Sequence, residues 1–326
     1  MVNDKKRRNS SFESLRMLLI FMVMLGHANK WYLGDYYQSE TEHWIRIAVE
    51  AVCLPAVNAF VLISGWFGIT SDYKRVYSLI YQLLICTVPL ALWFAVIGEI
   101  NLFSMKAIDK YIFGWGNYWF IIDYIGLVLF APVLNLIVEN ASKQVLQIFL
   151  INSLILIVLF DLILRSTVLG MEGGYSLLWF VYLYLLARYM RLYGCEWIVK
   201  YRWTIILVCL VMQTVLLYYH LASNRYTNPL ILFPAICLMF VFKDFTFHSK
   251  VVNYMASGTL MAYMLHMQPC LTDEIRGFLN RLYRENGYYL YICEVIGMIV
   301  ALYLVAVIID KFQAMGWKFF TRKLLH

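Results

Sequence analysis

The first apolar segment of the chain, SLRMLLIFMVMLGHANKW, carries Arg16 and His27 with no other ionisable side chain between them. Eleven helical steps of about 100° each return to nearly the same face, with a rise of roughly 16 Å. Ionisable groups inside hydrocarbon normally face a protein interior or a wet cavity and mark working sites. An imidazole there is a candidate general base, and a guanidinium is a candidate anion site. The alternatives are an Arg16 that reaches the membrane surface and a His27 satisfied by a neighbouring helix.

The composition indicates a polytopic membrane protein. Hydrophobic residues make up 62% of the chain and charged residues only 14%, whereas about a quarter of the residues in a soluble domain are charged. The formal net charge of +7 comes from basic residues spread through short segments, so we expect no nucleic-acid partner. The seven cysteines show no metal-ligand spacing, so we interpret them as packing thiols and expect no metal site.

The hydropathy pattern predicts an all-α bundle of about ten transmembrane helices in one domain, residues 1–326. Windows long enough to cross hydrocarbon fall near residues 15–33, 47–69, 77–98, 118–138, 146–164, 175–193, 203–220, 228–242, 254–271 and 288–309. With the N-terminus in the cytoplasm, most Lys and Arg fall in cytoplasmic segments, as the positive-inside rule requires. An even number of spans then makes residues 1–14 a basic cytoplasmic tail and residues 311–326 a second cytoplasmic tail. The two longer external segments are residues 34–46 and 272–287.

Several polar side chains should lie at a similar depth in this arrangement. His27 is about halfway through the first span, and the ninth span carries His266 to a similar depth, so the two imidazoles could meet near the midplane. The alternative for His266 is a bond to a backbone carbonyl. Asp123 lies more than one turn into the fourth span and could orient an imidazole and fix its tautomer. Glu50 is a rival for that role, and either carboxylate could instead be solvated at the interface.

The second span adds two small polar side chains. Asn58 should lie near the middle of the membrane, and Ser64 near the inner end beside a glycine that allows close helix approach. No neighbouring residue identifies a base for Ser64, so we favour a packing or substrate-contact role over a nucleophilic one.

Longer sequence patterns point to a known family. Arg16 and His27 form an Arg-x10-His pattern, which NAFVLISGWFG follows in the second span. Further along come WFIIDYIGLVLFAPVLN, with a Trp, a later Tyr and a Pro-x-Leu-Asn motif, and AYMLHMQP, with a Tyr and a His. These segments reach from residue 12 to about residue 270, and together they resemble the acyltransferase 3 family of integral membrane proteins.

The resemblance implies transfer of an acyl group, usually acetyl, from cytoplasmic acyl-CoA to a sugar hydroxyl of a surface polysaccharide or its lipid-linked precursor. It also implies a multi-pass protein of the bacterial cytoplasmic membrane that acts in the cell envelope. The partners would be acetyl-CoA or another acyl-CoA as donor, the glycan acceptor and the lipid bilayer, and the oligomeric state stays open. His27 would act as general base or form an acyl-histidine intermediate.

The remaining site assignments follow from this resemblance and from the predicted depths. The catalytic group would comprise Arg16, His27, Asp123 and His266. The donor, through its phosphates or its arm, would be bound by Arg16, Ser64, Lys74 and Arg75. Acceptor binding would involve Glu42, His43, Asn58, Trp119 and Tyr124. The developing oxyanion would take a hydrogen bond from Asn58, Tyr124 or His266.

Non-enzymatic functions give different expectations. Intramembrane Arg, His and Asp also suit a transporter or flippase of an anionic glycolipid or of an acyl donor, which would move its substrate without consuming acyl groups. A polysaccharide polymerase would need a larger external loop than residues 272–287. A sensory or scaffold domain would leave the intramembrane polar side chains without a purpose.

Overall fold

The computed structural model describes residues 9–70, 73–114, 116–221 and 223–324. Within these ranges the chain is all-helical, without a β-strand. In chain order the elements are α1 (Ser11–Gly26), η1 (His27–Tyr32), α2 (Glu40–Cys53), α3 (Pro55–Phe67), α4 (Tyr73–Val96), α5 (Met105–Ile108), η2 (Asp109–Phe113), α6 (Trp119–Asn140), α7 (Lys143–Ile157), η3 (Val158–Ile163), η4 (Glu172–Gly174), α8 (Leu177–Tyr193), α9 (Glu196–Tyr218), α10 (Pro229–Asp244), α11 (Lys250–Ala256), α12 (Thr259–His266) and α13 (Pro269–Leu324).

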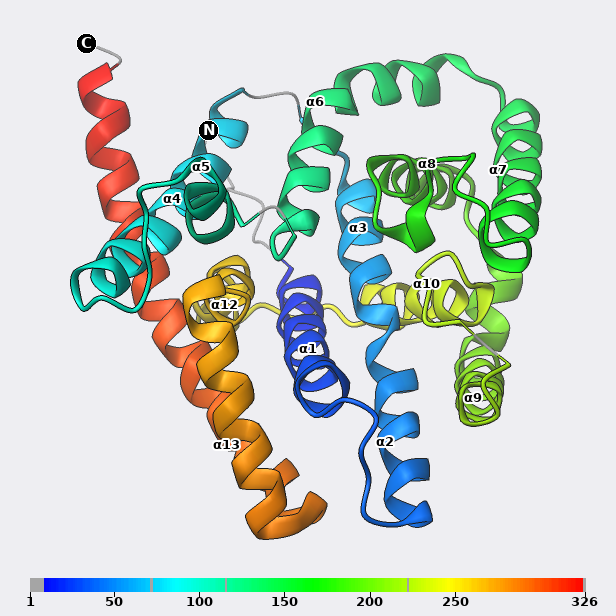
Figure 1. Ribbon diagram of the computed structural model, residues 1–326. Helices are drawn as coiled ribbons and strands as arrows, with labels where there is room; N and C mark the ends of the chain where they lie inside the picture. Colours follow the sequence, from blue (N-terminus) through cyan, green and yellow to red (C-terminus); the bar gives the residue numbers. More distant parts are fainter. Residues whose placement is uncertain (1–8, 71–72, 115, 222, 325–326) are drawn as a thin grey trace.

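Helix α1 lies at the centre of the molecule (Figure 1). On one side it packs with α2, α3 and α10, and on the other with α11, α12 and α13. Its apolar residues serve two separate cores. Leu15 and Leu19 belong to the core shared with α3, α8 and α10, whereas Ile20 and Met24 belong to the core shared with α12 and α13. Neither core includes Arg16 of α1 or His27, the first residue of η1.

Seven helices or continuous helix pairs among the described residues are long and apolar enough to cross a membrane, which makes this a multi-pass membrane protein. They match seven of the ten predicted windows. The other three windows are also helical but shorter: α8 has 17 residues, α10 has 16, and the ninth window is divided between α11 and α12. The total of ten spans and the cytoplasmic side of the termini stay predictions.

Two glycines explain where the helices in the last third of the chain depart from the predicted bounds. Gly258 lies between α11 and α12, and a Cβ there would come within 2.6 Å of the side chain of Val307 in α13. Gly287 interrupts α13 with a φ of 69°, a value that L-residues rarely adopt. Around it, the predicted external segment 272–287 is helical, and the helix also continues through residues 311–324, which we expected to form a tail. Residues 1–8 of the other predicted tail lie outside the described ranges.

Candidate active site

The two intramembrane histidines meet, as their predicted depths indicate. His27 Nδ1 lies 3.1 Å from His266 Nε2, and the ring centroids are 5.1 Å apart. His266 comes from the last residue of α12 and is buried, whereas His27 begins the π-helical segment η1 at the end of α1. Between the break before it and the turn after it, the short helix α12 packs against α1, and its last residue meets His27 just beyond the end of α1.

Hydrogen bonding determines which nitrogen of His27 is available. His266 Nδ1 lies 3.0 Å from the carbonyl oxygen of Ala262, and because a carbonyl only accepts, this nitrogen carries the proton. In neutral His266, Nε2 is then an acceptor, and His27 Nδ1–H donates to it. The remaining nitrogen of His27, Nε2, carries a lone pair. His27 lines a large cavity, so its imidazole can present a proton acceptor or a nucleophile to a bound substrate.

The cavity has a volume of about 940 Å³ and follows α1 along most of its length. The α1–η1 residues on its wall run from Glu13 to Trp31, a distance of roughly 27 Å at 1.5 Å per residue. That is close to the roughly 30 Å thickness of a bilayer core. Polar and aromatic residues on the wall include Glu13, Arg16, His27, Lys30, Trp31, Glu50, Ser64, Arg75, Trp119, Tyr124, Glu172, Tyr175, Asn224, Tyr226, Ser257 and Tyr263.

Arg16 and His27 both lie on the cavity wall, as their helical spacing predicts. Arg16 Nη1 donates to Glu13 Oε1 at 2.6 Å, one turn earlier on the same helix. The Glu13 side chain is 5% exposed and that of Arg16 28% exposed. Glu13 therefore fixes the guanidinium at one end of the cavity. The i, i+3 spacing of the two charges was a usable signal in the sequence, but it did not enter our site prediction.

Ser64, Arg75 and Tyr124 form a polar cluster on the same half of the cavity. Arg75 Nη2 donates to the Tyr124 hydroxyl at 2.9 Å, and that hydroxyl lies 3.2 Å from Ser64 Oγ. These three predicted residues thus come together from α3, α4 and α6. Ser64 and Arg75 were predicted to bind the acyl donor, whereas Tyr124 was predicted to bind the acceptor. Lys74, also predicted to bind the acyl donor, is exposed and is not among the described side chains on the wall.

The predicted carboxylate partners of His27 need correction. Asp123 is half-buried in α6, and within the described ranges no hydrogen bond or ion pair joins it to either imidazole. Glu50 lines the cavity but accepts a hydrogen bond from Asn224 Nδ2 at 2.5 Å. His266, held by a backbone carbonyl, occupies the position that we assigned to a carboxylate. The bond to a backbone carbonyl, weighed above as the alternative role for His266, is also present.

Two residues predicted to bind the acceptor differ in their placement. Asn58 is fully buried, donates to the carbonyl of Tyr226 at 2.8 Å and accepts from Trp179 Nε1 at 2.9 Å. Its amide therefore joins α3 to α8 and to the segment before α10; Asn58 is not itself on the cavity wall, but its partner Tyr226 is. Trp119 does line the cavity, with its ring centroid 4.5 Å from that of Tyr175.

Glu42 and His43, also predicted to bind the acceptor, lie away from the large cavity. Glu42 is buried, accepts from the backbone N–H of Gln38 at 3.1 Å and accepts from the Tyr283 hydroxyl. The His43 ring stacks on Tyr37 with centroids 4.0 Å apart. Both side chains hold the turn before α2 in place.

Sequence reasoning missed two aromatic residues of the site. Trp31 packs edge-on against the His27 ring, with centroids 5.2 Å apart. Tyr263 lines the cavity, has its ring 5.8 Å from that of His266, and donates to the carbonyl of Asn117 at 3.0 Å. Trp31 lies one turn beyond His27 and Tyr263 one turn before His266, so helical spacing was the available signal. In the part of the chain that the structure describes, no group of three or more His, Cys, Asp or Glu could hold a metal ion.

Comparison with known families agrees with this geometry. The acyltransferase 3 model, described as an acyltransferase domain, matches residues 9–311. That range includes Arg16 in α1, His27 in η1, α12, and every residue named on the cavity wall. Comparisons with curated proteins and with solved structures give no match. The chain therefore belongs to the acyltransferase 3 family, and it is a membrane acyltransferase that transfers groups other than amino-acyl groups.

Proposed function

We propose that the protein is an O-acetyltransferase of the bacterial cytoplasmic membrane, which moves acetyl from cytoplasmic acetyl-CoA to a sugar hydroxyl of a surface polysaccharide or its lipid-linked precursor. One observation carries the proposal. The His27 imidazole, oriented by its hydrogen bond to His266, lies on the wall of a cavity about as long as a bilayer core is thick. One half of this cavity holds Arg16 and Arg75. The proposal orients this half toward the cytoplasm, where the positive-inside rule favours Lys and Arg.

The donor would enter at the Arg16 end. Guanidinium groups suit phosphate recognition because their charge and planar donors match phosphate oxygens. Arg16 and Arg75 come from different helices, so they can contact the phosphates of CoA from two directions. The rise of roughly 16 Å from Arg16 to His27 suits the extended pantetheine arm, which would carry the thioester to the imidazole.

His27 would act as general base. Its Nε2 accepts the proton of the acceptor hydroxyl while that oxygen attacks the thioester carbonyl, and the imidazolium keeps its Nδ1–H bond to His266. The tetrahedral intermediate collapses, the C–S bond breaks, and the CoA sulfur leaves with the proton returned from Nε2. The products are the acetyl ester and CoA-SH, so atoms and charges balance. General acid–base catalysis of this kind contributes about 10²–10⁴ in rate.

None of the three predicted oxyanion donors enters the proposed reaction. Asn58 already donates to a backbone carbonyl and His266 Nδ1 donates to Ala262. The Tyr124 hydroxyl accepts from Arg75 and lies beside Ser64 Oγ, on the half of the cavity that the proposal assigns to the phosphates of CoA. A donor to the oxyanion would have to lie beside His27, where the charge develops on the carbonyl oxygen.

The test uses membranes that carry the protein, labelled acetyl-CoA and a glycan fraction. His27→Ala should abolish transfer, and Arg16→Gln should raise KM for acetyl-CoA with little change in kcat. Matched controls are His43→Ala and Arg202→Gln, because His43 stacks outside the cavity and Arg202 pairs with Asp244. Full transfer by His27→Ala would refute the assignment of the base.

The same membrane preparation distinguishes an acyltransferase from a transporter, and it distinguishes direct transfer from a route through acyl-His27. A flippase would move label without forming free CoA. When acceptor is omitted, direct transfer should leave no acetyl label bound to protein separated rapidly from acetyl-CoA at neutral pH, whereas an acyl-His27 route would leave acid-labile label that His27→Ala lacks.

A further inference from the structure

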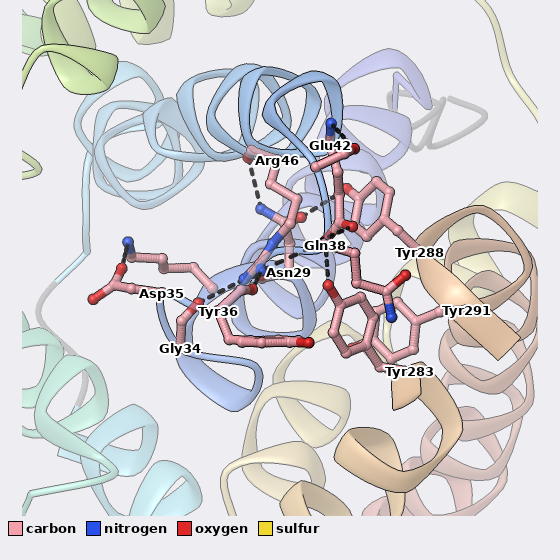
Figure 2. Close-up of polar contacts among 12 residues, drawn as sticks. Asn29, Gly34, Asp35, Tyr36, Gln38, Glu42, Arg46, Tyr283, Tyr288 and Tyr291 are labelled. Atoms are coloured by element: carbon pink, nitrogen blue, oxygen red, sulfur yellow. Dashed lines mark hydrogen bonds and ion pairs between the residues drawn. The ribbon is translucent and has the colours of Figure 1, made fainter. Parts of the chain in front are cut away.

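A buried arginine lies behind the catalytic histidine of the proposed reaction. Arg46, in α2, is 5% exposed, yet it contacts three backbone carbonyls from the segment that follows His27 (Figure 2). Its Nη2 donates to the carbonyls of Asn29 at 2.7 Å and Gly34 at 2.6 Å, and its Nη1 donates to that of Tyr36. A guanidinium can serve several acceptors at once because its donors are fixed in a planar fork.

The contacted segment has carbonyls that the helix does not satisfy. At His27 the α-helical hydrogen-bond pattern changes to the π pattern, and the helix ends at Tyr32. Carbonyls in the last turn of a helix need partners outside it. The Tyr291 hydroxyl donates to Ala28 O at 2.8 Å, and Asn280 Nδ2 donates to Tyr32 O at 2.9 Å. Arg46 satisfies the carbonyl of Asn29, which lies between them.

The Asn29 side chain completes the arrangement. Its Nδ2 donates to the carbonyl of Arg46 at 2.8 Å, and its Oδ1 accepts from the Tyr288 hydroxyl at 2.8 Å. Asn29 and Arg46 therefore exchange bonds in both directions, and Tyr288 and Tyr291 join them to α13. Glu42 provides the nearest opposite charge, with its Oε1 3.9 Å from Arg46 Nη1.

We propose that Arg46, with Tyr288 and Tyr291, is a positioning unit that holds η1 so that His27 Nδ1 faces His266. The inference rests on the proposed function, in which His27 is the base. Arg46 and both tyrosines lie outside the wall of the large cavity, so the unit acts on the reaction only through residues 28–36, by their backbone carbonyls and the Asn29 side chain. Ala28, the contact of Tyr291, is the residue directly after His27. A shift there changes the direction in which the imidazole points.

The experiment measures kcat and KM for acetyl-CoA in Arg46→Lys and Tyr291→Phe. The lysine side chain introduced by Arg46→Lys carries the charge but has only one nitrogen for three carbonyls. Misplacement of a catalytic group by about 1 Å lowers rate roughly 10²-fold, so we expect Arg46→Lys to lower kcat by about that factor with KM unchanged. Tyr291→Phe should lower kcat by about tenfold.

Tyr182→Phe is the matched control. The Tyr182 hydroxyl donates to the carbonyl of Leu150 at 3.3 Å, is buried, and joins α8 to α7 away from His27. A merely structural role for Tyr291 would make Tyr291→Phe and Tyr182→Phe alike, with similar shifts in thermal unfolding and wild-type kcat. That result would overturn the inference. A kcat loss in Tyr291→Phe only, at a Tm similar to that of the control, would support it.

The outcomes also separate this inference from the proposed function. If the wild type consumes no acetyl-CoA with any glycan acceptor, the proposed function is wrong. If the wild type is active, His27→Ala is inactive, and both Arg46→Lys and Tyr291→Phe keep wild-type kcat, only the positioning role is wrong. Should Arg46→Lys fail to fold, Tyr291→Phe alone decides the question.

Discussion

Replacement of His266 by Leu tests the histidine pair most directly. The variant keeps an apolar side chain in a buried position but removes the acceptor for His27 Nδ1–H. A hydrogen bond to a charged group contributes about 1.5–3 kcal/mol, and His27 is charged in the transition state of the proposed reaction. At about 1.36 kcal/mol per factor of ten, kcat should fall by roughly 10- to 150-fold. KM should not change, because His266 lies outside the cavity wall.

His266→Gln provides the matched control, since the side-chain amide oxygen of Gln can take the place of the imidazole Nε2 as acceptor. We expect it to keep kcat within about tenfold of wild type. The assay is steady-state transfer from labelled acetyl-CoA in membranes, with protein amount measured for each variant. Equal kcat values for wild type and His266→Leu would refute the proposal that the hydrogen bonds from the Ala262 carbonyl through His266 orient His27 for catalysis. So would a loss in His266→Leu that appears in KM and not in kcat.

Three further substitutions have outcomes that follow from the geometry. Asp123→Asn should keep kcat within about twofold, because Asp123 bonds neither imidazole; a loss of about 10²-fold in the transfer assay would restore it as the orienting group. Asn58→Leu should lower the Tm in detergent, because it leaves Trp179 Nε1 and the carbonyl of Tyr226 without hydrogen-bond partners. Each unsatisfied group should destabilise the protein by about 1–3 kcal/mol. An unchanged Tm would contradict the role of Asn58 in joining these helices. Gly258→Ala should destabilise the fold by about 1–3 kcal/mol, because the added Cβ would lie 2.6 Å from the Val307 side chain. Gly297→Ala is the control: its added Cβ would meet no atom within 4 Å, so its Tm in detergent should not fall.

Helix periodicity and hydropathy determined much of this protein from the sequence. Apolar windows predicted every long helix that can cross a membrane among the described residues, because backbone groups in lipid must be satisfied within the segment. The spacing from Arg16 to His27 put both side chains on one face, and both line the cavity. The depth of His266 followed from its position in the ninth window. These are local properties, and they depend on the chain's own geometry alone.

The partners of these residues depended on tertiary structure. Asp123, Glu50 and His266 were all candidates at a suitable depth, and only the break at Gly258 and the short α12 bring His266 to His27. In the sequence, Arg46 is one of several basic residues in the segments predicted to be external. In the structure, its hydrogen-bond acceptors are backbone carbonyls. Because every residue has a carbonyl, no side-chain pattern in the sequence identifies which ones a buried guanidinium will contact. Tertiary packing alone decides that, by selecting which helix ends lie against one another.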